Sequence, residues 1–350
     1  MKGRKKLIVN VLFLVLIFSF TFYGLLKEEE LSDLIKSLEL AKIGYLILGL
    51  VFVVIFVCSE SVIIHYMMRS LNRETSFGSC IKYSFIGFFF SCITPSASGG
   101  QPAQIYYMKK DGIDIPTSSL VLMIVTIGYK LVLVVIGAFL LLFQQKLLHQ
   151  YMTPISNFFL YLGMVLNVIG IGGLLFLVLK PSFVKAMLLW IQKLLVKLHI
   201  MKNISEKVMD SMEQYHETAQ FFQTHLKVMM RVFYLSVFQR VCLFYVTYLV
   251  YRSFGLHGVS AYTIVMLQAV ISLSVDMLPL PGGMGASESL YMILFASIFG
   301  KTFLLPSMIL SRGISYYALL LISAIVTSYA HLTMGRVARK RMTLEGSCED

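Results

Sequence analysis

The sequence predicts an all-α polytopic membrane protein, and three observations support this prediction. Of its 350 residues, 57% are hydrophobic and 14% are charged, and the mean hydropathy is +0.79. Apolar runs of about 20 residues, long enough to cross a bilayer as a helix, recur along the whole chain. Proline and glycine interrupt two of the apolar segments. Few residues are left for a soluble domain, and the longest predicted extramembrane piece is 181–227.

Six apolar segments are predicted to be full transmembrane spans. They are 7–26, 43–68, 118–143, 155–179, 228–251 and 305–332. Two further segments, 78–108 and 261–299, contain the interruptions and are predicted to be re-entrant hairpins that enter and leave on one side. The basic N-terminus and the run 7–26 resemble a signal peptide. Because the run is too long and has no small-residue cleavage site, we expect a retained span.

The basic residues favour this topology, because cytosolic loops of membrane proteins carry an excess of Lys and Arg. Most of the 30 Lys and Arg residues fall on the side that would be cytosolic together with both termini. The other side holds Lys27, Lys36, Lys42, Lys146, Arg252 and Lys301. If 78–108 crossed fully, either Lys109 and Lys110 would lie outside or the later loops would invert. The alternative is that one or both interruptions are only kinks in full spans.

Hairpins that open on opposite sides divide the chain into two halves of opposite orientation. The first half is 1–150 and the second is 151–335, followed by a charged cytosolic tail at 336–350. Inverted repeats of this kind build binding sites near the bilayer midplane, between the hairpin tips. The connector 181–227 is amphipathic in its first part. It is predicted to be an interfacial helix on the cytosolic leaflet or an ordinary helical linker.

The two interruptions are the candidate binding site. Proline lacks a backbone N–H and paired glycines have no helical preference, so each interruption is expected to leave unwound backbone and a new helix start inside the membrane. The first N–H groups of a helix are unpaired and partially positive, which suits a phosphate. The alternative is a kink with packing glycines. The candidate residues are Pro95, Ser96, Ser98, Gly99, Gly100, Gln101 and Pro102, and then Pro279, Pro281, Gly282, Gly283 and Gly285.

Ionisable side chains inside apolar segments are costly and are therefore functional candidates. They are Glu60, Lys130, Arg240, Asp276, Glu288 and Arg312. Glu288 should lie near the start of the helix after the second interruption, as a proton carrier or as an anchor of the tip. Arg240 and Arg312 are expected to pair with Asp276 and Glu288 or to bind a lipid phosphate. The alternative is a set of internal salt bridges that only fix helix packing.

The chain contains no motif typical of a metal site, an enzyme or a nucleotide-binding protein. The five cysteines are scattered without metal-ligand spacing, and there is no His-Glu-x-x-His, Walker or Cys-x-x-Cys motif. We therefore predict no catalytic residue, no metal and no cofactor. The net charge of +12 follows membrane topology, so no nucleic-acid partner is expected. The oligomeric state is not predicted.

These residues also carry a family resemblance. Pro-x-x-x-Gly-Gly-x-Pro at 95–102, Leu-Pro-x-Pro-Gly-Gly-x-Gly-x-x-Glu at 278–288 and then Arg312 resemble the lysylphosphatidylglycerol synthase transmembrane-region family. Its members include the flippase half of the multiple peptide resistance factor. The resemblance covers about residues 7–332. The family often has an Arg followed by an acidic residue in the span after the first interruption. Here Lys130 is the nearest equivalent and no acidic residue follows it.

The resemblance implies a lipid flippase of a bacterial cytoplasmic membrane. Its substrate would be a phospholipid or a lipid-linked anionic head group, such as aminoacyl-phosphatidylglycerol. A lipid-modifying synthase is an implied partner. In fused relatives a cytosolic domain makes lysyl-phosphatidylglycerol, a lipid linked to antimicrobial peptide resistance. We expect no such domain and no enzyme activity here, because only 335–350 follow the last span. The alternatives are a small-solute or ion transporter, and a membrane component of phosphatidylglycerol lysyltransferase that needs a separate catalytic domain.

Overall fold

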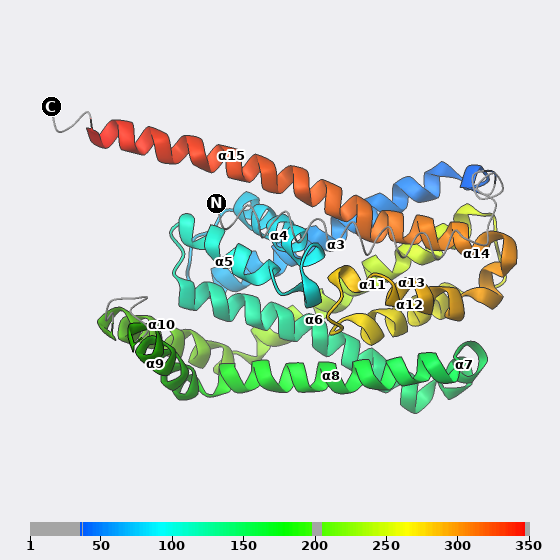
Figure 1. Ribbon diagram of the computed structural model, residues 1–350, viewed down its shortest axis with the longest axis horizontal. Coiled ribbons are helices and arrows are strands. Elements are labelled where there is room, and N and C mark those ends of the chain that lie inside the picture. Colours follow the sequence, from blue (N-terminus) through cyan, green and yellow to red (C-terminus); the bar gives the residue numbers. More distant parts are fainter. Residues whose placement is uncertain (1–35, 37, 198–204, 347–350) are drawn as a thin grey trace.

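The computed structural model describes residues 36, 38–197 and 205–346, and every regular element in that part of the chain is helical (Figure 1). The elements are α3 (Ile43–Ser70), α4 (Phe77–Cys92), η1 (Pro95–Ala97), α5 (Gly100–Lys110), α6 (Ile115–Phe143), α7 (Gln145–Tyr151), α8 (Pro154–Leu179), α9 (Pro181–Lys197), α10 (Ser205–Thr224), α11 (Leu226–Ser253), α12 (Ala261–Val275), η2 (Pro281–Gly283), α13 (Ala286–Leu294), α14 (Ala296–Arg312), η3 (Gly313–Ala318) and α15 (Leu319–Gly346). The predicted span 7–26 lies outside the described residues.

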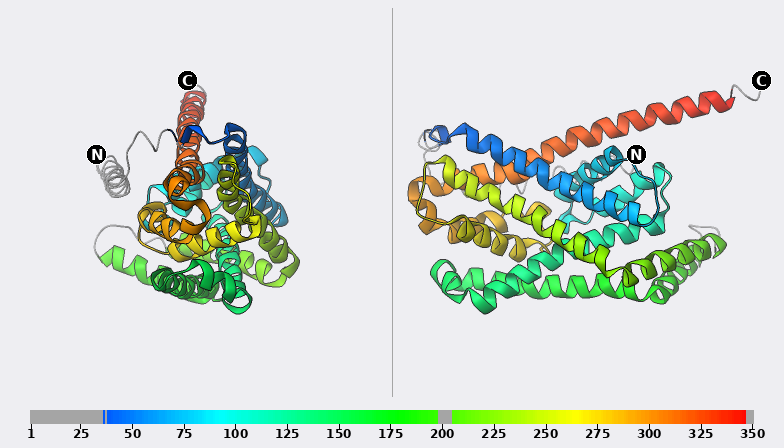
Figure 2. Two further views of the ribbon diagram at one scale, coloured as in Figure 1. Left: turned by 90° about the vertical axis from the view of Figure 1, so that its right-hand side faces the viewer. Right: turned by 180° about the vertical axis from the view of Figure 1, so that it is seen from behind.

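Five helical stretches are long and apolar enough to cross a membrane: α3, α6, α8, α11 and the continuous run Ala296–Leu332. They match five of the predicted spans, and they lie side by side as a bundle in the end-on view of Figure 2. Their outward faces are apolar. The side chains of Leu142, Ile169 and Ile325, for example, are 65–70% exposed. Outward apolar surface on so many long helices suits a lipid environment, so the chain is a multi-pass membrane protein.

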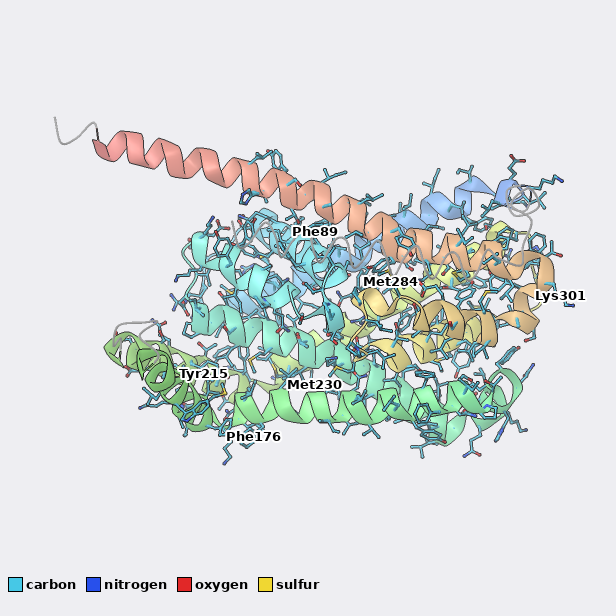
Figure 3. The ribbon with its side chains drawn as sticks, in the orientation of Figure 1. Phe89, Phe176, Tyr215, Met230, Met284 and Lys301 are labelled. Carbon is cyan, nitrogen blue, oxygen red and sulfur yellow. The ribbon has the colours of Figure 1, made fainter. Side chains whose placement is uncertain are left out.

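The chain turns at the two ends of the bundle, where polar side chains cap the helices. Ser76, Asp114, Thr153 and Ser260 each accept a hydrogen bond from the backbone N–H three residues later. Figure 3 places Tyr215 of α10 at one end of the molecule and Lys301 of α14 at the other. These N-caps therefore mark the ends of the bundle at which α4, α6, α8 and α12 begin.

The first interruption folds α4 and α5 back on each other as a helical hairpin whose tip is η1. The unwound residues are Ser96 and Ala97, with φ of 49° and 54°. The expectation that the glycine pair would unwind is wrong at this tip. Gly99 has φ −83° and Gly100 begins α5, which makes Pro102 the third helical residue rather than the first. Close packing explains why position 100 is a glycine. A Cβ at Gly100 would collide with the carbonyl oxygen of Gly87 on α4.

The second interruption folds α12 and α13 into another hairpin, and here the glycines do unwind. Gly282, Gly283 and Gly285 have φ of 56°, 66° and 83°, a region that favours glycine. The helix after the tip begins at Ala286. Gly300, at φ 66°, then reverses the chain within α14. The segment 261–299 therefore contains a hairpin, and the chain turns at Gly300 directly after it.

The two hairpins lie end to end along the long axis of the molecule. In Figure 1 the α4–α5 hairpin opens toward the end that holds α9 and α10, and the α12–α13 hairpin opens toward the end that holds α7. Their tips, η1 and η2, are in contact. The middle of the molecule is therefore built from unwound backbone and helix ends.

The connector and the tail are both helical. The predicted connector 181–227 forms α9 and α10, and Tyr215 of α10 donates a hydrogen bond to the carbonyl oxygen of Leu177 at 3.1 Å. Phe183 and Trp190 on α9 are 48% and 65% exposed, which fits both interpretations of this segment. Helix α15 continues through most of the predicted tail, to Gly346.

Candidate functional site

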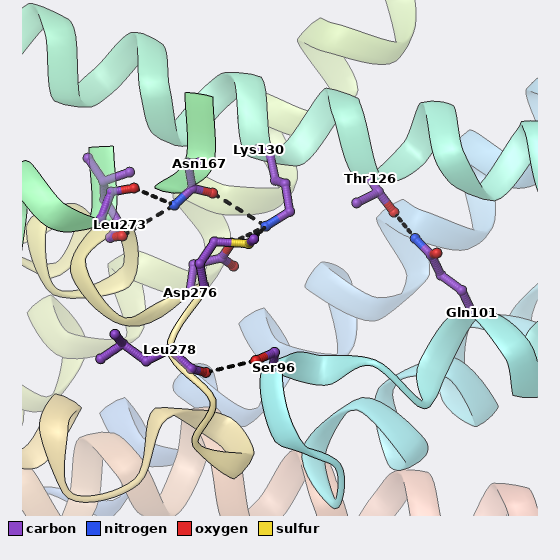
Figure 4. A network of polar contacts seen from close by, with 10 residues as sticks. Ser96, Gln101, Thr126, Lys130, Asn167, Leu273, Asp276 and Leu278 are labelled. Atoms are coloured by element: carbon purple, nitrogen blue, oxygen red, sulfur yellow. Dashed lines mark hydrogen bonds and ion pairs between the residues drawn. The ribbon is translucent and has the colours of Figure 1, made fainter. Parts of the chain in front are cut away.

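The two hairpin tips touch at the centre of the bundle. The Ser96 hydroxyl, at the first tip, donates a hydrogen bond to the carbonyl oxygen of Leu278, at the second tip, at 3.1 Å (Figure 4). The Tyr316 hydroxyl, in η3, donates to the carbonyl oxygen of Cys92 at the end of α4, at 2.9 Å. The second hairpin and the helix that follows it therefore both hold the first tip.

A cavity of about 260 Å³ lies between the tips. Six of the sequence candidates line it: Glu60, Gln101, Arg240, Asp276, Gly282 and Arg312. Other polar residues line it too: Ser91, Gln104, Thr126, Tyr129, Gln239, Thr247, Gln268, Ser272, Ser315 and Tyr316. Most of the remaining candidates shape the tips or support the lining. Ser98 is exposed at the first tip and is not among the lining residues.

Glu288 makes three hydrogen bonds at the second tip. Its Oε1 accepts a 2.7 Å bond from Arg312 Nε, and its Oε2 accepts from the backbone N–H of Gly285 at 2.7 Å and from the Ser287 hydroxyl at 3.0 Å. Arg312 also donates to the carbonyl oxygen of Gly282 at 3.0 Å. The Glu288 side chain is only 2% exposed. The carboxylate is thus fully engaged as the cap of α13 and the partner of Arg312.

A π-helical turn, η3, follows Arg312 directly. Turns of this kind are rare and occur often at functional sites. The turn places Tyr316 against the cavity, with the Arg312 guanidinium 4.7 Å from the centre of its ring. Gly282 packs so closely on Tyr316 that an added Cβ would meet the ring. The π turn, Arg312 and Gly282 therefore form one packed unit.

Lys130 and Asp276 form an ion pair between α6 and the end of α12 (Figure 4). Lys130 also donates to Asn167 of α8 at 3.3 Å, and Asn167 in turn donates to the carbonyl oxygen of Leu273 at 3.4 Å. Asp276 was expected to pair with an arginine. Its partner is instead Lys130, which is buried and lies beside it because α6 and α12 pack together.

Arg240 differs from Lys130 and Arg312, which are both paired with carboxylates. Its Nε is buried and has no hydrogen-bond partner among the described residues, and its guanidinium lies 4.4 Å from the centre of the Tyr129 ring. Glu60 attracts it electrostatically, but no ion pair within 4.0 Å joins them in the described chain. The Glu60 carboxylate instead accepts a 2.8 Å bond from the amide of Gln104 on α5.

Sequence reasoning missed the neutral half of the lining. On α12, Gln268, Ser272 and Asp276 follow each other at intervals of four and line the cavity from one helix face. Arg312, Tyr316 and Leu319, at intervals of four and then three, line the cavity across η3. A search for polar residues at helical spacing from each intramembrane charge would have found several of these residues.

This geometry can be compared with known proteins. The family model described as "Lysylphosphatidylglycerol synthase TM region" matches residues 7–323. The chain belongs to this family. No curated protein matches it. The match includes both hairpins and Arg312, so membership in the lysylphosphatidylglycerol synthase TM-region family covers the whole central cavity.

Proposed function

We propose that this family member is a flippase that moves a phospholipid or a lipid-linked anionic head group across a cytoplasmic membrane. One observation supports the proposal above the others. Arg240 lines the central cavity with a buried Nε that has no acceptor among the described residues. Lys130 and Arg312 are already paired with carboxylates. A phosphate oxygen would supply the missing acceptor in a charge-assisted hydrogen bond.

The other lining residues suit the remainder of a head group. The Glu60 carboxylate interacts with the amides of Gln104 and Gln239, and its two oxygens keep acceptor capacity for a hydroxyl or an ammonium group. Gln101 and Gln268 offer neutral amides on the two hairpins. The helix starts at the tips add partial positive charge. In this proposal Arg240 binds the phosphate and Glu60 binds donors of the attached group.

The lipid assignment rests on the family and on the size of the cavity. The family name refers to lysylphosphatidylglycerol, an aminoacylated phospholipid. The volume of about 260 Å³ lies at or below the small end of ligand pockets, roughly 300–1,000 Å³. It suits a head group whose acyl chains remain in the bilayer. An anion site of this size also suits a small solute, and the family name also suits a membrane partner of a separate lysyl-lipid synthase.

Transport would use the hairpins as two gates. We infer that both are re-entrant, that they open to opposite sides of the membrane as an inverted repeat, and that both termini are cytosolic. Ser96 with Leu278, Tyr316 with Cys92 and Lys130 with Asp276 are contacts across the centre that must break and re-form. Inverted repeats commonly work in this way, by movement of one half against the other around a central site.

The proposal is tested by reconstituting the chain in liposomes and measuring translocation of an anionic phospholipid. Arg240→Gln should lower the rate at least tenfold, and Arg240→Lys should lie between it and the wild type, because lysine lacks the planar fork of arginine. The control is Arg231→Gln, which removes an exposed charge from the same helix and should leave the rate within twofold.

Three outcomes would contradict the proposal. Normal translocation by a folded Arg240→Gln protein would remove its main support. Transport of a soluble anion without lipid movement would favour the solute transporter. An aminoacyl-lipid product made by the purified chain alone would favour an enzyme.

A further inference from the structure

A second polar pocket lies at the turn between α3 and α4, at one end of the bundle. It has a volume of about 780 Å³. Its lining consists of His65, Arg69, Asn72, Arg73, Glu74, Thr75 and Ser76. None of these residues lines the central cavity, so the proposed transport site leaves this pocket without a role.

Two residues of the pocket lining carry buried hydrogen-bonding atoms without partners in the described part of the chain. His65 Nδ1 and Thr75 Oγ1 are both buried and have no hydrogen-bond partner among the described residues. A buried polar atom left in this state costs about 1–3 kcal/mol. Two such atoms in a single seven-residue pocket point to a ligand that completes their hydrogen bonds.

The two arginines of the pocket suit an anionic ligand. Arg69 forms no ion pair within 4.0 Å in the described part of the chain. Arg73 reaches only Asp114, at 3.4 Å, and its side chain is 54% exposed. Both guanidinium groups can therefore donate to an oxyanion, a geometry in which arginine binds phosphate well.

The start of α4 faces the same pocket through its cap. Ser76 is the N-cap of this 16-residue helix and accepts from the N–H of Ser79 at 3.1 Å. The N–H groups of Phe77 and Gly78, next to the lining residue Ser76, precede the first intrahelical bonds of α4 and so have no partner within the helix. The helix dipole adds partial positive charge at this point.

The acidic residues limit the charge of the ligand. Glu74 lines the pocket, and Asp114 shares Arg73. These carboxylates oppose a doubly charged phosphate monoester more than a singly charged phosphodiester. Glu74 can also accept from a hydroxyl or an amine attached to the diester.

An apolar surface adjoins the pocket. The Phe77 ring packs edge-on against the His65 ring, with centroids 5.8 Å apart, and Phe77 is 43% exposed. Val62, one turn before His65 on α3, is 39% exposed. A phosphodiester site beside exposed apolar side chains at the end of a membrane bundle fits a lipid head group with its chains alongside the helices.

We propose that the α3–α4 pocket binds the phosphodiester of a membrane phospholipid, separately from the central cavity. Arg69 and Arg73 bind the phosphate oxygens, with His65 and Thr75 as the buried hydrogen-bond partners. Glu74 accepts from the head-group alcohol or amine.

The test uses the purified full chain in detergent, with Arg240→Gln as the parent so that the central anion site does not contribute. Binding is measured by titration calorimetry with dihexanoyl phosphatidylglycerol, glycerophosphoglycerol and inorganic phosphate. Arg69→Gln with Arg73→Gln should weaken binding of the short-chain lipid at least tenfold. The matched control, Lys109→Gln with Lys110→Gln, removes two exposed charges at the end of α5 and should change it less than twofold.

A second variant separates hydrogen bonding from charge. Thr75→Val keeps every charge and should weaken lipid binding about fivefold through one lost hydrogen bond, without lowering the unfolding midpoint of the free protein. Glycerophosphoglycerol should bind through the same residues but more weakly than the lipid. Equal losses in the arginine and lysine variants would overturn the proposal, and so would inorganic phosphate that binds as tightly as the lipid. Translocation in the wild-type background is measured separately, so either proposal can fail alone.

Discussion

The two hairpins solve the same structural problem with different chemistry. At the second tip, glycines take up the left-handed backbone, and a buried ion pair between Glu288 and Arg312 fixes the outgoing helix. At the first tip, Ser96 and Ala97 are left-handed although neither is glycine. There the outgoing helix is held by a neutral amide, Gln104, bonded to Glu60. The residues of the second tip therefore adopt their left-handed conformation without strain, whereas Ser96 and Ala97 of the first tip are strained.

This difference suggests which gate moves. Glu288 makes three hydrogen bonds within its own hairpin and the helix that follows, and one of them comes from the charged Arg312. At the first hairpin, α5 gives Glu60 one hydrogen bond, from the uncharged amide of Gln104. A left-handed conformation at a non-glycine residue costs roughly 1–3 kcal/mol. The first hairpin therefore has less to lose on rearrangement, and we expect it to be the more mobile of the two.

Replacing the carboxylate that bonds each outgoing helix, Glu288 at the second hairpin and Glu60 of α3 at the first, should produce the largest difference between the hairpins. Glu288→Gln leaves the buried Arg312 without its counter-charge. It also replaces the carboxylate oxygen that accepts from the N–H of Gly285 with an amide group. Breaking a buried pair from one side costs about 3–5 kcal/mol. Glu60→Gln keeps an acceptor for Gln104 and should cost less than about 1.5 kcal/mol.

The measurement is the free energy of unfolding of each purified variant in mixed micelles, by titration with a denaturing detergent. Glu288→Gln combined with Arg312→Gln removes both charges and is the control, and it should recover part of the loss. Equal destabilisation by Glu288→Gln and Glu60→Gln would show that the two tips are held alike.

A methyl group at the second tip should have the next largest effect. Gly282→Ala places a Cβ against the Tyr316 ring at a residue with φ 56°, so both packing and backbone oppose it. We expect a loss of about 2–3 kcal/mol from the combined strain. Gly112→Ala is the matched control, because Gly112 has φ 91° but no atom within 4 Å of the added Cβ. If the two variants unfold at the same denaturant concentration, contact with Tyr316 is not what requires glycine.

Much of the fold could be predicted because membrane spans depend on local composition. The bounds predicted from the length of each apolar run agree within a few residues with the observed bounds of α3, α6, α8 and α11. The spacing from the second glycine pair to Glu288 likewise placed a carboxylate in the first turn of α13. Short-range rules were sufficient for both results.

The tertiary contacts could not be predicted in the same way. Lys130 and Asp276 are 146 residues apart, and they meet only because α6 and α12 pack together. Which residues unwind at the first tip also depended on packing. Gly100 is needed where α5 approaches Gly87 of α4, so the unwound positions fall on Ser96 and Ala97 instead. A glycine pair in a sequence marks either a turn or a close approach, and only the neighbouring helix decides between them.

The smallest predicted effect is a gain of stability at the first tip. Ala97→Gly removes a Cβ from a residue with φ 54° and makes this tip resemble the second. Relief of left-handed strain should stabilise the protein, but glycine also increases the entropy of the unfolded chain, so the net gain should be about 0.5–1 kcal/mol. Because the strain also favours rearrangement of the first hairpin, translocation in liposomes should slow at the same time. Gly100→Ala, where a Cβ would collide with the backbone of α4, is the opposite change at the same tip and should destabilise it. An Ala97→Gly protein that is less stable than the wild type would mean that Ala97 is not strained. The expectation that the first hairpin is the more mobile of the two would then have no support from strain.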